Sequence, residues 1–157
     1  MLRLIENSKR FGTKCAIVDQ SDSYSFQDLL DRSEVIALHL LQGKEDLGQM
    51  RIAFMIAPGF DYVAVQWGIW RAGGIAVPLC VTYPLPSLQY VVEDTVAEMI
   101  ICGPEYEDIL SPFSMMPNIR FIRMSGLSKN ESGNLPEIEN QRGAMILYTS
   151  GTTSLPK

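Results

Sequence analysis

The sequence predicts an α/β fold in which helices flank a mostly parallel sheet. From residue 51 onward, apolar runs of strand length alternate with amphipathic patterns of helix length. The connections between them are short, as right-handed strand–helix–strand crossovers require. The apolar runs are nearly continuous, which is typical of strands covered on both faces. These three observations together favour a parallel sheet over an antiparallel one.

The first fifty residues predict a lead-in made of helices and a hairpin. Ser25 should begin the long helix, because Asp28 stands three residues after its hydroxyl, which is the spacing of a capping box. Apolar residues then recur at helical spacing up to Leu41, so one face of this helix should pack on a core. The expected elements are a helix over 2–10, strands over 15–18 and 23–25, and a helix over 26–41.

The rest of the chain predicts the β/α core. Gly73 and Gly74 should end one helix, Pro86 lies in the first turn of the next, and the polar residues 124–143 are expected to form a surface loop. The chain is therefore expected to be one α/β domain over 1–157, with 1–50 as lead-in and 51–157 as core. The expected strands are 51–56, 75–79, 98–102, 120–123 and 144–148, and the expected helices are 60–72, 86–95 and 105–110.

Composition excludes several classes of protein. The chain has 157 residues, of which 46% are hydrophobic and 20% charged, so it can bury a real core. Its formal net charge of −5 argues against nucleic acid or an anionic membrane as the main partner. No apolar run is long enough for a transmembrane helix, and the start lacks the pattern of a secretory signal.

The cysteines predict a reducing compartment. Cys15, Cys80 and Cys102 are odd in number and widely spaced, so they are expected to be reduced, buried thiols of a cytoplasmic protein. Three scattered cysteines and a single histidine do not make a zinc site, and no metal ligand is assigned.

The last ten residues, YTSGTTSLPK, carry the chemistry of an anion site. Five of them are Ser or Thr, and the segment contains Gly151 and ends in Lys157. It follows the apolar run 144–147, which predicts a buried strand, and ligands of open α/β sheets collect at the carboxyl ends of strands. Hydroxyls, backbone N–H groups and an ammonium suit a polyphosphate. On composition alone, a flexible polar tail remains the alternative.

This segment is not a Walker A loop. Five residues separate Gly151 from Lys157, and Pro156 stands where that motif has Gly. Pro156 also disfavours helical dihedrals at Leu155, so the segment is not expected to run straight into a helix. Hydroxyls, backbone donors and one lysine would therefore have to bind the anion without a helix dipole.

The segment resembles the AMP-binding signature of the adenylate-forming superfamily, which includes acyl-CoA synthetases, luciferases and peptide-synthetase adenylation domains. Ser154 departs from the pattern, because the family usually has Gly there. The pattern over 62–93 looks closest to acyl-CoA synthetases of the malonyl-CoA synthetase type. The resemblance covers essentially the whole chain, and its upstream segments follow in the family's order: SFQDLL at 25–30, WRAGGIAVPL at 70–79, YP at 83–84 and LQYVVED at 88–94.

The resemblance implies that the chain is the first subdomain of an acid–thiol ligase. In that reaction a carboxylate attacks the α-phosphorus of ATP, giving an acyl-adenylate and pyrophosphate, and the thiol of coenzyme A then displaces AMP. The implied cofactors of the full-length enzyme are ATP, Mg²⁺ and coenzyme A, and the implied partner is a carboxylic acid. Lys157 is the implied catalytic residue, which neutralises charge as pyrophosphate leaves. The residues implied to hold the polyphosphate are Thr149, Ser150, Gly151, Thr152 and Thr153.

The same resemblance implies an amino-terminal fragment that is inactive alone, because the family's adenine pocket and adenylation lysine follow this signature. Two other functions stay open: a non-catalytic nucleotide- or anion-binding module, and an inert truncated piece. Surfaces exposed by truncation are also expected to favour a homodimer. The acyl acid and the thiol acceptor are not predicted.

Overall fold

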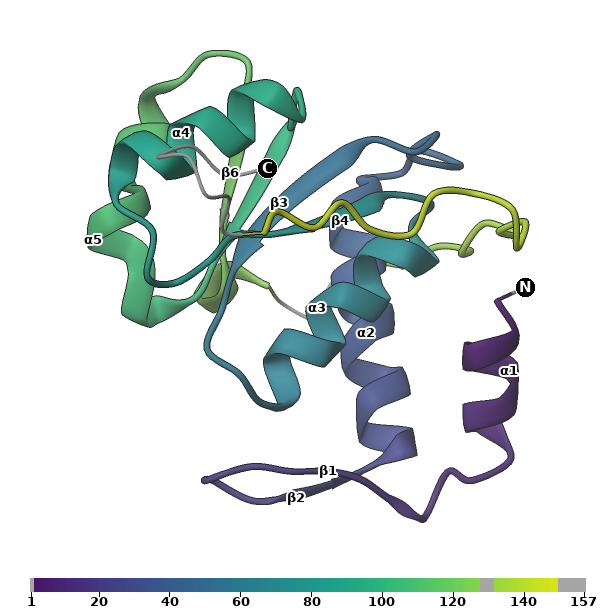
Figure 1. Cartoon of the computed structure of the whole chain (residues 1–157). Helices are drawn as coiled ribbons and strands as arrows, with labels where there is room; N and C mark the ends of the chain where they lie inside the picture. The colour runs from purple at the N-terminus through teal and green to yellow at the C-terminus, as the bar shows by residue number, and fades with distance from the viewer. Residues whose placement is uncertain (1, 128–131, 150–157) are drawn as a thin grey trace.

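A four-stranded parallel sheet forms the centre of the structure, a computed structural model that describes residues 2–127 and 132–149 (Figure 1). The strands stand in the order β4-β3-β5-β6, and all three neighbouring pairs are parallel. This confirms the predicted α/β fold class. The strands are β3 (Arg51–Met55), β4 (Ile75–Pro78), β5 (Met99–Cys102) and β6 (Arg120–Arg123).

Helices cover both faces of the sheet (Figure 1). Ile52 and Phe54 of β3 pack in one hydrophobic core with α2 and α3, whereas Ala53 and Met55 pack in a second core with α4 and α5. Successive residues of a strand point to opposite faces, so one strand serves both cores. The elements are α2 (Phe26–Leu41), α3 (Phe60–Arg71), α4 (Leu85–Asp94), α5 (Glu107–Leu110) and the 3-10 turns Pro104–Tyr106, Ser111–Met115 and Met124–Gly126.

The lead-in consists of α1 (Arg3–Lys9) and an antiparallel hairpin of β1 (Cys15–Val18) and β2 (Ser23–Ser25). The predicted capping box is confirmed: the Asp28 N–H donates to Ser25 Oγ at 3.1 Å, and the Ser25 N–H donates to Asp28 Oδ2 at 2.8 Å. Hydrogen bonds from the Ser25 side chain and backbone hold the pKa of Asp28 below its usual value. The long helix therefore begins where the sequence predicted.

Asp19 fixes the hairpin to the start of α3. Its Oδ2 accepts a hydrogen bond from the Phe60 N–H at 3.0 Å, and its Oδ1 accepts one from the Ser21 N–H at 2.8 Å. The Phe60 N–H contributes most to the lowered pKa of Asp19. The ring of Tyr24 also stacks on that of Phe60, with 4.1 Å between the centroids. The lead-in is thus joined to the core by contacts distant in sequence.

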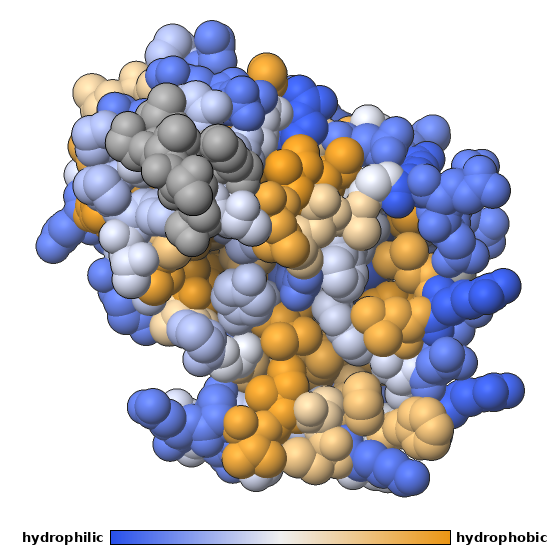
Figure 2. Space-filling view, viewed as in Figure 1, coloured by the Kyte–Doolittle hydropathy of each residue, from blue (hydrophilic) through white to orange (hydrophobic). Residues whose placement is uncertain are grey.

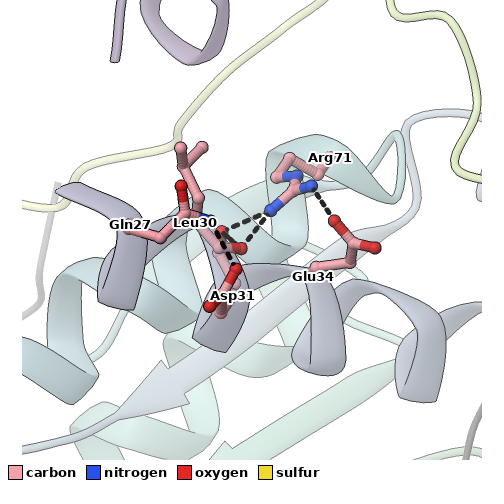
Figure 3. Close-up of polar contacts among 6 residues, drawn as sticks. Gln27, Leu30, Asp31, Glu34 and Arg71 are labelled. Carbon is pink, nitrogen blue, oxygen red and sulfur yellow. Dashed lines mark hydrogen bonds and ion pairs between the residues drawn. The ribbon is translucent and has the colours of Figure 1, made fainter. Parts of the chain in front are cut away.

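A buried arginine joins α3 to α2 (Figure 3). Arg71 is only 8% exposed. Its Nη1 donates to the Leu30 carbonyl at 2.5 Å and to Ser33 Oγ at 2.7 Å, while its Nη2 donates to Glu34 Oε2 at 2.7 Å. Nearby, Gly68 lets the two helices approach, because a Cβ there would lie 2.6 Å from Ile36 Cγ2.

The predicted buried strand over 144–148 is wrong in part. The Ala76 N–H donates to the Ala144 carbonyl at 3.0 Å and the Ile146 N–H to the Ala76 carbonyl at 2.9 Å, which makes one parallel bridge to β4. Leu147 is 65% exposed. Among the described residues, β4 is the one strand that pairs with this segment, so the backbone edge of the segment that faces away from β4 has no neighbouring strand. Figure 2 shows apolar residues exposed on the face across which the segment runs.

Two of the three cysteines are not buried, which corrects the prediction. Cys15 and Cys80 are exposed and Cys102 is buried. Cys15 begins the small hairpin and Cys80 lies just beyond β4, whereas Cys102 belongs to β5, which has a neighbouring strand on each side. Burial raises the pKa of the Cys102 thiol to about 11.

We expect a maleimide reagent near neutral pH to modify Cys15 and Cys80 and to leave Cys102 intact. Maleimide reacts with an accessible thiolate, and burial keeps the Cys102 thiol both inaccessible and protonated. Mass spectrometry should find two adducts on the folded protein and a third after unfolding in urea. A Cys102→Ala variant should gain no third adduct, and rapid modification of Cys102 in the folded wild type would contradict the prediction.

Beyond the 3-10 turn Met124–Gly126, the described residues of the polar stretch 124–143 form a loop, as predicted. Three of its apolar side chains are nevertheless buried, Met124 at 6%, Leu127 at 7% and Ile138 at 6% exposure. The loop is thereby attached to the body of the domain. No helix within residues 2–127 and 132–149 is long and apolar enough to cross a membrane.

Candidate functional site

The candidate site lies at the edge of the sheet where the parallel strands end. β3, β4 and β5 all point their carboxyl ends toward this edge. The segment 144–149 pairs in parallel with β4, so the chain reaches Tyr148 and Thr149 in the direction in which β4 ends. This is the edge at which ligands of open α/β sheets bind.

Tyr148 is fixed on α4. Its side chain packs against the second hydrophobic core, and its ring meets that of Tyr90 edge to face, with 6.4 Å between the centroids and 89° between the planes. Its hydroxyl donates a hydrogen bond to Asp94 Oδ2. Tyr90 and Asp94 stand one helical turn apart on the same helix. Burial, followed by the bond to Asp94, raises the pKa of Tyr148, so the phenol keeps the proton that it donates.

The start of the segment is fixed on the opposite side of the sheet. Trp70 of α3 donates its Nε1–H to the Ala144 carbonyl at 2.6 Å, and the Gly143 N–H donates to Gln49 Oε1 at 2.9 Å. Arg142 forms an ion pair with Asp46, at 2.7 Å between Nη1 and Oδ2. The backbone that leads to the candidate site is therefore tethered both before and after its bridge to β4.

Of the six site residues predicted from the sequence, the structure describes one. Thr149 is exposed and directly follows the fixed Tyr148. It lies at the carboxyl edge of the sheet, and its role in ligand binding stays a prediction. The other five, which lie outside the described residues, stay predictions: Ser150, Gly151, Thr152, Thr153 and Lys157.

The ends of β3 and β5 offer different chemistry. A hollow of about 490 Å³ lies there, lined in part by Asp19, Asp61 and Glu105. Carboxylates repel phosphate, so this hollow does not suit a polyphosphate. Within the part of the chain that the structure describes, no three or more His, Cys, Asp or Glu side chains lie together as metal ligands. Anion-binding chemistry is therefore expected at the end of segment 144–149.

Sequence reasoning missed the contact that fixes Tyr148. Asp94 reads in the sequence as a solvated charge, and it is indeed exposed, yet its carboxylate accepts the Tyr148 hydroxyl. Tyr90 and Asp94 stand four residues apart, which places them on one side of a helix. That spacing gives no sign of a partner 54 residues further along the chain.

Comparison with known proteins identifies the family. The profile of the family described as AMP-binding enzyme matches residues 4–157. The chain is 34% identical over 160 residues to the mitochondrial malonate–CoA ligase ACSF3 of Xenopus laevis, and 33% identical over 159 residues to that of Homo sapiens. Each alignment covers 94% of this chain but only 28% and 27% of the respective ligase. The chain thus spans little more than a quarter of the length of these relatives.

Solved structures share the fold. The inhibitor-bound N-terminal domain of FACL13 from Mycobacterium tuberculosis superposes with a TM-score of 0.83 at 18% identity, over 98% of this chain and 42% of that one. Apo MatB from Rhodopseudomonas palustris gives a TM-score of 0.74 at 23% identity, over 92% of this chain and 31% of that one.

Proposed function

Since this chain belongs to the AMP-binding enzyme family, we propose that it is the amino-terminal part of an ATP-dependent carboxylate–CoA ligase. The malonate–CoA ligases to which it is 31–34% identical support this proposal. The observation that carries it is the anchoring of Tyr148, which holds Thr149 at the carboxyl edge of the sheet. The division into a lead-in over 1–50 and a core over 51–157 of a larger domain is part of the same proposal.

In the proposed reaction, residues 149–153 donate backbone and hydroxyl hydrogen bonds to the polyphosphate of ATP, and Lys157 neutralises charge as pyrophosphate leaves. Such donors accelerate phosphoryl chemistry because they meet the charge that develops on the phosphate oxygens. Bound Mg²⁺ would supply further positive charge to those oxygens. It prefers oxygen ligands such as carboxylates, and we assign none of its ligands to the described residues.

We propose malonate as the first acid to test, because the relatives with the highest identities given above are named malonate–CoA ligases. Coenzyme A is the proposed acceptor for the same reason. The expected cytoplasmic location and the expected homodimer stay predictions, and those ligases are described as mitochondrial.

The test is ATP–pyrophosphate exchange by the full-length protein against a panel of carboxylic acids, followed by detection of acyl-CoA. We expect one acid of the panel to support exchange and thioester formation. We expect the 157-residue polypeptide alone to give neither, because it spans little more than a quarter of the ligases' length.

Failure of every acid to support exchange would contradict the proposed function, and acyl-CoA formed by the 157 residues alone would contradict their inactivity. Calorimetry with ATP on the same polypeptide separates the two remaining alternatives. Binding without exchange by the full-length protein would favour a non-catalytic nucleotide-binding module, and the absence of both would favour an inert piece.

A further inference from the structure

We propose that Asp94 and Tyr148 act together as a positioning pair for the ATP-binding segment, with the Asp94 carboxylate holding the Tyr148 hydroxyl and so orienting the chain at Thr149. The proposal rests on the proposed function, because it concerns the segment to which ATP binding is assigned. In this proposal neither residue contacts the substrate. Their role is to fix the backbone from which the binding residues follow.

Backbone pairing alone does not fix this part of the chain. The bridge to β4 involves Ala144 and Ile146, and Leu147 beyond it is 65% exposed. Tyr148 then provides both a packed ring and a directed hydrogen bond immediately before Thr149. The contacts that immediately precede Thr149 are therefore those of a side chain.

The acceptor of this hydrogen bond is itself held firmly. Asp94 is the last residue of α4, and the next residue, Thr95, is buried and donates its hydroxyl to the Val91 carbonyl at 2.7 Å. Arg51 of β3 donates its Nε–H to the Thr95 carbonyl at 2.9 Å. A continuous set of contacts therefore runs from the central strand through the end of α4 to Tyr148.

Packing alone would not require the Tyr148 hydroxyl. The edge-to-face contact with Tyr90 needs only the aromatic ring, which Phe would also supply. The hydroxyl adds direction, because a hydrogen bond to a carboxylate is stronger and more strictly oriented than ring contact. Tyr148→Phe therefore separates the positioning role from the packing role.

The test uses the full-length enzyme and the acid that supports exchange. We expect Tyr148→Phe and Asp94→Ala each to lower kcat/KM for ATP about tenfold, since small displacements at a reacting site cost large factors in rate. The KM for the carboxylate and the melting temperature should stay near wild type. Asp94→Asn keeps an acceptor oxygen and should restore part of the loss. Glu93→Ala, at the exposed neighbouring carboxylate, is the matched control and should behave as wild type.

A double variant decides whether the two residues act through one contact. Tyr148→Phe combined with Asp94→Ala should lose no more activity than either single variant. Additive losses, or single variants with unchanged kcat/KM for ATP beside an active wild type, would overturn the positioning role and leave the proposed function standing. Absence of exchange by the wild type with every acid would overturn both.

Discussion

Alanine at both Thr152 and Lys157 is expected to lower the rate of ATP–pyrophosphate exchange by the full-length enzyme about 10²–10³-fold or more. The proposed segment supplies donors to oxygens on which charge develops, and removing one such donor costs about that factor in well-studied enzymes. The loss should appear mainly in kcat, because a donor that acts on developing charge stabilises the transition state more than bound ATP. Steady-state exchange at varied ATP concentration measures both parameters.

Single variants and a distant lysine provide the controls. Thr152→Ala alone should cost less than Lys157→Ala, because a charged donor contributes more than a neutral one. Lys44→Ala removes an exposed ammonium at the other end of the fold and should leave exchange unchanged. An exchange rate indifferent to the double substitution would remove the basis for assigning residues 149–157 to ATP.

Arg71→Ala is expected to lower the free energy of unfolding by about 2–4 kcal/mol. The guanidinium donates to a backbone carbonyl and a hydroxyl in the α2–α3 interface, and a buried polar group that loses its partner costs about 1–3 kcal/mol. Loss of the packed alkyl chain adds to this. Urea denaturation followed by circular dichroism measures the change.

The Glu34 contact should contribute little by comparison. Its side chain is 54% exposed, and solvent weakens such ion pairs, so Glu34→Ala should cost less than about 1 kcal/mol. Arg71→Lys keeps the charge but loses the planar fork and should fall between the two. Equal stabilities of Arg71→Ala and Glu34→Ala would show that the buried hydrogen bonds do not stabilise the interface.

Most of the fold could be predicted because the local sequence patterns agree with the burial of the same residues in the structure. The continuous apolar runs that became β3 and β5 are covered on both faces, and the Ser25–Asp28 spacing formed its capping box. The expected ends of strands and helices differ from the observed ones by few residues. Each of these features depends on residues close together in the sequence.

What the sequence did not predict depends on contacts between distant residues. Burial of Arg71 is set by partners 37 to 41 residues away, and a charged residue is otherwise expected at the surface. Exposure of Leu147 depends on how many strands pair with its segment. For the candidate site, residue chemistry indicated a stretch that is proposed to bind phosphate, whereas the contact of Tyr148 with α4 depends on the fold and was not predicted.

The stretch 144–149 connects the two helical layers that cover the sheet. At its start, Trp70 of α3 donates a hydrogen bond to the Ala144 carbonyl. Near its end, the ring of Tyr148 packs against Tyr90 of α4, in the other helical layer. Between them, Met145 faces the first core and Ile146 the second. A sliding movement of one helical layer against the other must therefore displace the backbone of this stretch. The position of Thr149 thus depends on the packing of both helical layers.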